Sequence, residues 1–122
     1  MPIRCLIVDD HEEFLEAARI LLEREGMSVA GVASTSAEAL SEVETLRPDV
    51  VLVDIFLGDE SGLELARSLA EDGRGPSAVV LISTHSEADL AGLIADSPAA
   101  GFLSKADLSA EAIRRIVDGR AR

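Results

Sequence analysis

The sequence lacks several features that would assign it to a particular environment. It contains no Trp or Tyr and only three Phe, and Cys5 is its single cysteine. One cysteine cannot form an internal disulfide, and its place in an apolar strand indicates a small buried side chain. No apolar run approaches the roughly 20 residues of a membrane span, and the N-terminus has no signal-peptide pattern. These absences predict a cytosolic (cytoplasmic) protein without a membrane partner.

Basic residues are also scarce. The chain has 11 Lys and Arg against 23 Asp and Glu, which gives a formal net charge of −12. This balance disfavours direct binding to nucleic acid or to an anionic membrane surface. It suits a domain that attracts cations or the basic patches of protein partners.

The apolar residues that are present suffice for one core. They make up 48% of the 122 residues, and this length fits one domain of ordinary size. The sequence contains no repeat, no low-complexity segment and no stretch typical of an interdomain linker. Residues 1–122 are therefore predicted to form one domain.

Short apolar strands and amphipathic helices alternate along the chain. Strands are predicted over residues 3–8, 28–33, 49–53, 78–82 and 101–104. Helices are predicted over residues 11–25, from a capping box at Thr35 and Glu38, from Ser61, over residues 87–95 and from about Ser109. Five such units favour an α/β fold with a doubly wound, five-stranded parallel sheet of order 2-1-3-4-5.

Two of these helices show apolar faces that are expected to be buried. The expected faces are Phe14, Ala17, Ala18, Leu21 and Leu22 in the first helix and Leu90, Leu93 and Ile94 in the fourth. The fourth helix is short and contains Gly92, which costs about 1 kcal/mol relative to Ala. It is therefore predicted to be the least stable helix.

Polar residues stand where the apolar strands end. They are Asp9 and Asp10, Asp54, Ser83 and Lys105. In the predicted order the first, third, fourth and fifth strands, which carry these residues, are consecutive neighbours about 4.8 Å apart, so the side chains should meet at one edge of the sheet. Two unit charges roughly 4 Å apart repel by about 4 kcal/mol at an effective dielectric of about 20. An ammonium and a hard divalent cation such as Mg²⁺ would offset this repulsion, and the set suits phosphoryl transfer to an aspartate.

Most of these residues also have a structural explanation, which the sequence leaves open. Asp10 with Glu13 matches a capping box for the first helix. The serine is compatible with a turn, and Lys105 with a solvated loop. The two histidines, His11 and His85, are expected to be surface or loop residues and not ligands.

Four segments of the chain carry a resemblance to a known family. They read LIVDDHEEF, RPDVVLVDIFLGDESGLEL, VVLIS and GFLSK. Together they resemble a response-regulator receiver domain of the CheY-like family, over essentially the whole chain. The resemblance implies a flavodoxin-like (βα)5 fold and a role in two-component signal transduction. It implies no enzyme activity beyond assistance to the domain's own phosphorylation and dephosphorylation.

The resemblance also implies a phosphorylation site and a metal site. Asp54 would accept a phosphoryl group from a sensor histidine kinase or a histidine phosphotransfer protein, and Lys105 would contact that group. Mg²⁺ (or Mn²⁺) would be bound by Asp10 directly and by Asp9 through water. An oxygen of Asp54 and the backbone carbonyl of Phe56 would be further metal ligands.

Ser83 and Phe102 are implied to form the switch. Ser83 fits the resemblance better than Thr84 because of its distance along the chain from Asp54 and from Lys105. Successive strand side chains also point to opposite faces, so only one of the two hydroxyl residues faces the site. The face of the fourth helix, fifth strand and fifth helix would carry the signal, and a homodimer through this face is one expectation.

Three positions depart from the family pattern. Ala106 follows the lysine where proline is usual, and a residue other than proline favours a trans bond by about 3 kcal/mol. Thr84 is larger than the usual Ala or Gly, and Phe56 is bulky and apolar. Phe56 and Thr84 lead to the hypothesis that phosphorylated Asp54 loses its phosphoryl group slowly.

Two other functions stay open at this point. A receiver-like domain that takes no phosphoryl group would act as a protein interaction scaffold. A small Mg²⁺-dependent phosphatase with Asp54 as its nucleophile is disfavoured. Phosphatases of the haloacid dehalogenase type need a second aspartate at the position where Phe56 stands.

Overall fold

A five-stranded parallel sheet forms the centre of the molecule. The computed structural model describes residues 3–71, 76 and 78–120. Within these residues the sheet has the order β2-β1-β3-β6-β7. Its strands are β1 (Arg4–Val8), β2 (Ser28–Ala33), β3 (Val50–Asp54), β6 (Ala78–Ser83) and β7 (Gly101–Ser104). The predicted strand order and the α/β fold class are confirmed.

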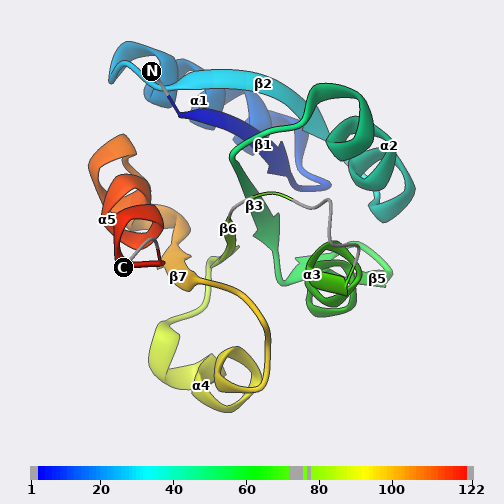
Figure 1. The fold of residues 1–122 in the computed structure, drawn as a ribbon. Helices are drawn as coiled ribbons and strands as arrows, with labels where there is room; N and C mark the ends of the chain where they lie inside the picture. The colour runs from blue at the N-terminus through cyan, green and yellow to red at the C-terminus, as the bar shows by residue number, and fades with distance from the viewer. Residues whose placement is uncertain (1–2, 72–75, 77, 121–122) are drawn as a thin grey trace.

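Helices cover both faces of this sheet. In the described part of the chain they are α1 (Glu12–Arg24), α2 (Ser36–Leu46), α3 (Gly62–Glu71), α4 (Glu87–Ala95) and α5 (Ala110–Arg120). Figure 1 shows α1 and α5 on one side of the sheet and α2, α3 and α4 on the other. This is the arrangement that right-handed connections between parallel strands produce. None of the described helices has the length and apolar character that a membrane crossing requires.

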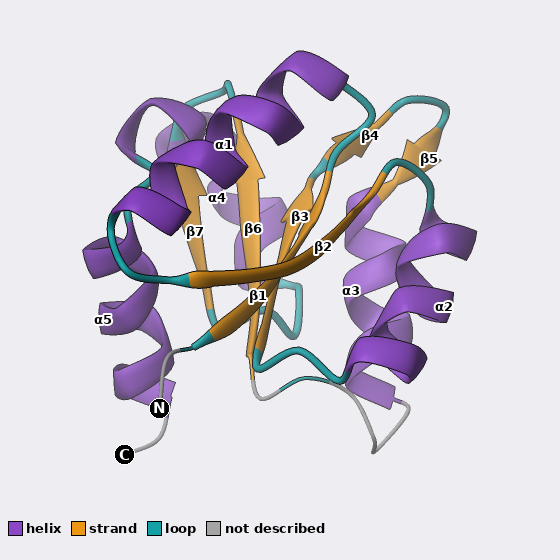
Figure 2. Ribbon diagram, turned by 90° about the horizontal axis from the view of Figure 1, so that it is seen from above, coloured by secondary structure: helices purple, strands orange, loops and turns teal. Residues whose placement is uncertain are grey.

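Two small elements follow the main strands β3 and β7. An antiparallel hairpin is formed by β4 (Phe56–Leu57) and β5 (Glu60–Ser61), with Gly58 at a φ of 60° in its turn. Figure 2 shows this hairpin beyond the tip of β3. A single 3₁₀ turn, η1 (Lys105–Asp107), follows β7. The sequence indicated only a loop at the first place and no turn at the second, because such short elements carry no periodicity.

The core consists of two layers, one on each face of the sheet. Side chains alternate along β1, so Leu6 and Val8 pack in the layer under α2, α3 and α4, while Cys5 and Ile7 pack in the layer under α1 and α5. The central strands β3 and β6 are buried at every position, as expected when helices cover both faces. Burial raises the pKa of the Cys5 thiol to about 12, so this cysteine is a packing residue.

The buried face of α1 agrees with the predicted one in part. Ala18 and Leu22 are buried as predicted, together with Leu15, whereas Ala17 and Leu21 are exposed. Two apolar stripes run along this helix about 100° apart, one residue out of step with each other. Because both stripes have helical spacing, periodicity does not choose between them. Which stripe is buried depends on the direction in which the chain leaves β1 and on the rotation of α1 on the sheet.

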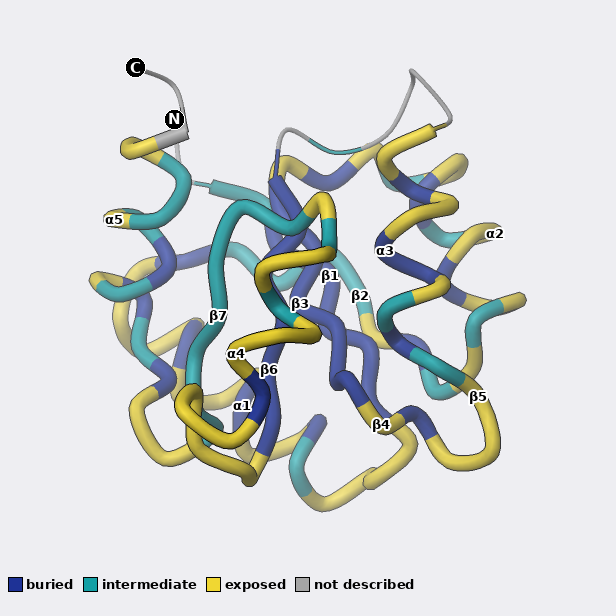
Figure 3. The backbone as a smooth tube through the Cα atoms, turned by 90° about the horizontal axis from the view of Figure 1, so that it is seen from below, coloured by how far each residue is buried: buried dark blue, intermediate teal, exposed yellow. Residues whose placement is uncertain are grey.

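Helix α4 is only lightly anchored. Leu90 is its one buried residue, whereas Leu93 is 46% exposed and Ile94 is half-buried. The prediction that Leu93 packs into the core is therefore wrong. Figure 3 shows α4 coloured mostly as exposed, in contrast to the buried strands behind it.

Candidate functional site

The structure places the polar strand ends at one edge of the sheet. Asp54 is the last residue of β3 and Ser83 the last of β6, while Asp9 directly follows β1 and Lys105 directly follows β7. The pairs β1–β3, β3–β6 and β6–β7 are all parallel. Parallel neighbours end at the same edge, so four separate stretches of the chain supply side chains to one region.

Lys105 lies between two buried carboxylates. Its Nζ is 2.6 Å from Oδ2 of Asp9 and 3.2 Å from Oδ2 of Asp54, and it donates a hydrogen bond to the latter. Asp9 has no exposed surface and Asp54 is 4% exposed. The bond between Lys105 and Ala106 is trans. These ion pairs connect the ends of β1, β3 and β7 through the only lysine in the sequence.

Burial and charge shift the pKa values in this cluster. Burial raises the pKa of Asp54 above its ordinary value; the Lys105 ammonium acts against this, and the charge of Asp9 adds to it. Burial alone would lower the pKa of Lys105, but its contacts with Asp9 and Asp54 outweigh burial and raise it. The lysine is therefore held in its charged form, and two carboxylates share it. The cluster is short of positive charge.

Two more exposed groups follow Asp9. The Asp10 side chain is 33% exposed and the His11 side chain 67%. Nδ1 of His11 lies 2.9 Å from Oδ1 of Asp9 and 3.3 Å from Oδ1 of Asp10. The hydrogen bond with Asp9 and then the charge of Asp10 raise the pKa of His11 above its ordinary value. His11 is a surface residue, as expected, yet it contacts both acidic residues before it.

Asp10 does not cap α1, contrary to the capping-box explanation. The N-cap residue is His11, and in the described part of the chain its side chain makes no capping hydrogen bond. The helix begins one residue later than a cap at Asp10 requires. Glu13 lies in the first turn, where the helix dipole favours an acidic side chain. The place of Asp10 is therefore not explained by the helix.

The cluster fits a hard divalent cation. Asp9, Asp10, His11 and Asp54 each offer one ligand atom, and these atoms lie within 4.8 Å of one another. Oδ2 of Asp9 is buried and is paired with the Lys105 ammonium at 2.6 Å, so one cation already offsets part of the negative charge. Carboxylate oxygens are the ligands that Mg²⁺ and Mn²⁺ prefer. A divalent cation would offset the rest of the charge.

The loop after Asp54 is held tightly. The backbone N–H of Phe56 donates to Oδ1 of Asp54 at 3.1 Å, and the backbone N–H of Gly62 donates to the carbonyl of Ile55 at 2.9 Å. Gly62 begins α3 directly behind Asp54. A Cβ at Gly62 would overlap the carbonyl oxygen of Asp54 and lie 2.8 Å from its carbonyl carbon. A glycine is therefore needed for α3 to begin this close to the site.

The side chain of Ser83 is buried and is contacted by His85. Ser83 is 1% exposed, whereas Thr84 is exposed. The backbone N–H of His85 donates to Oγ of Ser83 at 3.1 Å, and Nδ1 of His85 lies 3.3 Å from the same oxygen. The His85 ring also packs against the ring of Phe56, with centroids 5.2 Å apart. The loops after β3 and β6 are thus joined by an aromatic contact.

Phe102 lies at some distance along β7 from this cluster. It is half-buried and packs against the core layer that contains Leu90 of α4. With Ser86, Glu87 and other residues it lines a surface hollow of about 380 Å³. Phe102 therefore lies where a shift of α4 would alter its surroundings.

The sequence does not predict the positions of three side chains at the site: His11, His85 and Phe14. Nζ of Lys105 lies 4.4 Å from the centre of the Phe14 ring, a cation–π contact. The signal for His11 was its position directly after the acidic pair, and the signal for His85 was its closeness to Ser83 along the chain. Phe14 had no such signal, because its direction depends on how α1 is rotated on the sheet.

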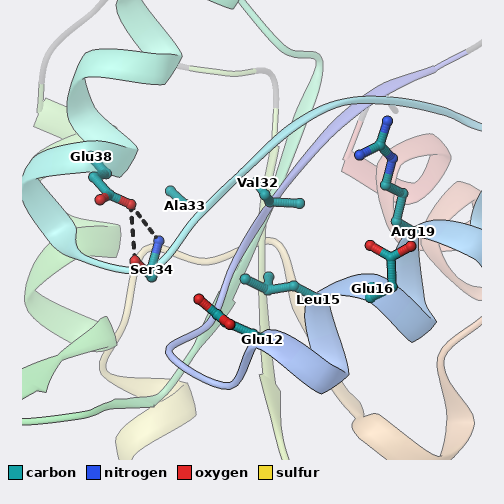
Figure 4. Close-up of a pocket in the computed structure, with 8 residues that line it drawn as sticks. All are labelled: Glu12, Leu15, Glu16, Arg19, Val32, Ala33, Ser34 and Glu38. Carbon is teal, nitrogen blue, oxygen red and sulfur yellow. Dashed lines mark hydrogen bonds between the residues drawn. The ribbon is translucent and has the colours of Figure 1, made fainter.

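A separate hollow lies between α1, β2 and the segment that leads to α2 (Figure 4). Its volume is about 340 Å³. Its lining comprises Glu12, Leu15, Glu16, Arg19, Val32, Ala33, Ser34 and Glu38. The backbone N–H and the hydroxyl of Ser34 both donate to Glu38. These lining residues do not include the members of the cluster around Asp54, so the strand ends remain the candidate site.

The sequence matches one family and several curated proteins. Residues 5–118 match the family model of the response regulator receiver domain. Response regulator UvrY of Escherichia coli is 34% identical over 122 residues, which cover 97% of this chain and 56% of that protein. Protein-glutamate methylesterase/protein-glutamine glutaminase 5 of Myxococcus xanthus is 38% identical over 91 residues, which cover 74% of this chain and 26% of that protein. The chain thus spans about half or less of the length of these relatives.

Solved structures resemble the chain over nearly its whole length. One is the signal receiver domain of a modulated diguanylate cyclase from Desulfovibrio desulfuricans, with a TM-score of 0.79 and 30% identity over 98% of this chain and 94% of that one. Another is a two-component response regulator of the LuxR family from Aurantimonas, with a TM-score of 0.82 and 27% identity over 98% and 88%. Both likenesses include the strands that carry the polar cluster.

Proposed function

Because the chain belongs to the response regulator receiver domain family, we propose that residues 1–122 form a phosphorylation-dependent signalling domain of the cytoplasm. Asp54 accepts a phosphoryl group from a sensor histidine kinase or a histidine phosphotransfer protein. The observation that carries this proposal is the position of Lys105 between the buried carboxylates of Asp9 and Asp54. A fixed cation beside an oriented carboxylate is suited to receive a transferred anionic group.

The proposed reaction is a transfer from nitrogen to oxygen. A carboxylate oxygen of Asp54 forms a bond to phosphorus, while the bond from phosphorus to the donor's histidine nitrogen breaks and its electron pair stays on that nitrogen. The N–H of Phe56 and the ammonium of Lys105 each contact one oxygen of Asp54, which limits the orientations of the carboxylate. Lys105 then offsets negative charge on the phosphoryl oxygens.

The metal in this proposal is Mg²⁺ or Mn²⁺. Its ligands are Asp10 directly, Asp9 through water, an oxygen of Asp54 and the backbone carbonyl of Phe56. When bound, the cation supplies the positive charge that three carboxylates and a phosphoryl group require. Support comes from the donor set, because Asp9, Asp10 and Asp54 each offer a carboxylate oxygen within a group that spans 4.8 Å.

The signal in this proposal leaves the site through Ser83. The hydroxyl of Ser83 turns towards the phosphoryl group and gives up its contacts with His85. The loop that leads to α4 then changes, and Phe102 and the face of α4, β7 and α5 change with it. A partner or a second copy of the chain binds this face. The net charge of −12 supports protein partners and disfavours direct binding of nucleic acid by this domain.

Intact-mass measurement tests the proposal. Incubation with acetyl phosphate and Mg²⁺ should add about 80 Da, the mass of one phosphoryl group, and Asp54→Asn should abolish this gain. Asp59→Asn, which changes an exposed carboxylate in the nearby hairpin, should retain it. No gain in the unaltered protein would favour the interaction scaffold. Sustained hydrolysis of a phosphate ester would favour the phosphatase.

A further inference from the structure

We propose that Phe14 is a positioning residue for Lys105. The face of its ring keeps the ammonium of Lys105 beside Asp54, so that the lysine meets an incoming phosphoryl group without first being reoriented. The inference rests on the proposed function for the group that is transferred. It adds a residue of α1 that acts through the lysine and touches neither the phosphoryl group nor the metal.

Three groups surround the ammonium of Lys105. Its Nζ lies 2.6 Å from Oδ2 of Asp9 and 3.2 Å from Oδ2 of Asp54. The same nitrogen lies over the ring of Phe14, 4.4 Å from the ring centre. An ammonium carries three N–H donors, so it accommodates two carboxylate partners and one further contact. The ring face is suited to be that contact, because its quadrupole attracts a cation within about 6 Å.

The ring of Phe14 is itself held in place. Phe14 lies in the first turn of α1 and is half-buried. It packs against the core layer under α1 and α5, which includes Leu15 and Leu108. The ring is therefore fixed by the core on which α1 rests, whereas Lys105 has a long and flexible side chain. The contact joins the start of α1 to the end of β7.

The contact with the ring differs from the two ion pairs of the lysine. In the proposed function Asp54 receives the phosphoryl group and Asp9 also serves the metal, so both carboxylates change partners during the reaction. The ring carries no net charge and takes part in neither event. The Lys105 side chain is only 11% exposed, and a cation–π contact is stronger where water is excluded. Phe14 can therefore hold the ammonium while its anionic partners change.

Substitutions at Phe14 separate this role from simple packing. Leucine fills apolar space without a ring face, whereas tyrosine keeps the ring face. With acetyl phosphate and Mg²⁺, Phe14→Leu should slow the mass gain of the protein about 10-fold. This factor corresponds to about 1.4 kcal/mol, within the range of partly desolvated cation–π contacts. Phe14→Tyr should restore most of the rate, and Leu21→Ala, at an exposed leucine of the same helix, should leave it unchanged.

Two results would overturn the role of Phe14. One is an unchanged rate in Phe14→Leu, and the other is a loss in Phe14→Tyr as large as that in Phe14→Leu. The second result would mean that only the shape of the side chain matters, since tyrosine retains the ring face.

NMR of the unaltered protein gives a test that does not depend on the folding of a variant. Lys105 is the only lysine in the sequence, so selective ¹³C-lysine labelling yields signals of this side chain alone. Its ε protons should be shifted upfield by the ring and should show nuclear Overhauser contacts with the Phe14 ring protons. Phosphorylation of Asp54 without either signal rejects only the role of Phe14. Both signals without phosphorylation reject only the signalling function.

Discussion

Helices α3 and α4 cover the same face of the sheet, yet they are held in different ways. Four residues of α3 are buried, Gly62, Leu65, Ala66 and Leu69, whereas α4 buries Leu90 alone. Their lengths are similar, at 10 and 9 residues, so the difference lies in packing and not in size. One helix is part of the core, and the other lies on its surface.

The difference matters because each helix is connected to the site. Helix α3 begins at Gly62, in contact with the backbone carbonyl of Asp54. Helix α4 is reached through the loop that follows Ser83 and contains His85. A close-packed element resists displacement, while an element with few buried contacts opens or shifts at low cost. We therefore expect α3 to hold the proposed phosphorylation site in place and α4 to respond to it.

The largest expected effect comes from Gly62→Ala in α3. The added Cβ would overlap backbone atoms of Asp54, and backbone relieves such overlap poorly. We expect the free energy of unfolding to fall by about 4 kcal/mol, measured by urea denaturation. A loss below about 1 kcal/mol, the ordinary effect of a point substitution, would show that α3 is not fixed against the site.

Truncation of one leucine in each helix should lower the free energy of unfolding by less than Gly62→Ala does, and by different amounts in the two helices. Leu69→Ala should cost about 3 kcal/mol and Leu90→Ala about 2 kcal/mol, within the range for buried leucines. Hydrogen exchange followed by mass spectrometry gives the sharper contrast. Leu90→Ala should accelerate exchange in residues 87–95 while residues 62–71 stay protected, and Leu69→Ala should accelerate both. Equal acceleration by both variants would remove the distinction between the helices.

Gly92→Ala in α4 should have the opposite sign. A Cβ at this position meets nothing within 4 Å, and alanine favours a helix interior over glycine by about 1 kcal/mol. We expect a gain of stability of up to about 1 kcal/mol and slower exchange within α4. A destabilised variant would mean that α4 is packed more tightly than its exposure indicates.

The smallest expected effect is a pH dependence of stability that comes from Asp54, the residue behind which α3 begins. Asp54 has a raised pKa in the folded protein, so the folded state binds this proton more tightly than the unfolded chain. The resulting stability is present below the ordinary aspartate pKa of about 3.9 and is lost as pH rises through the raised pKa. Asp54→Asn should therefore gain stability relative to the unaltered protein over this window.

Urea denaturation at a series of pH values measures this effect. The difference between Asp54→Asn and the unaltered protein should grow with pH across the window and then become constant. Gly92→Ala changes no titratable group and should keep the pH profile of the unaltered protein. Parallel profiles for Asp54→Asn and the unaltered protein would contradict the raised pKa.

Much of the fold follows from the sequence because its signals are local. β2 at residues 28–33 and α4 at residues 87–95 have the predicted bounds, since apolar runs and capping residues mark them. The parallel order follows from the alternation of strands and helices. The buried stripe of α1 does not follow, because residues one step apart on that helix are equally apolar.

The sequence also predicts only some features of the candidate site. Asp9, Asp54, Ser83 and Lys105 were found from their positions at the strand ends, and a parallel sheet brings such ends to one edge. That rule does not predict which of these side chains contact one another. His11 and His85 lie in loops, where direction depends on backbone hydrogen bonds to Asp9 and to Ser83.

The sheet, its strand order and the chemical kinds of group at its polar edge could all be predicted from the sequence. These depend on periodicity and on polar residues at strand ends, which are properties of short segments. Only the packed structure shows that Lys105 pairs with both Asp9 and Asp54 and that His11 turns back to the acidic pair. These depend on the distances between segments remote in sequence, and only the packed chain defines such distances.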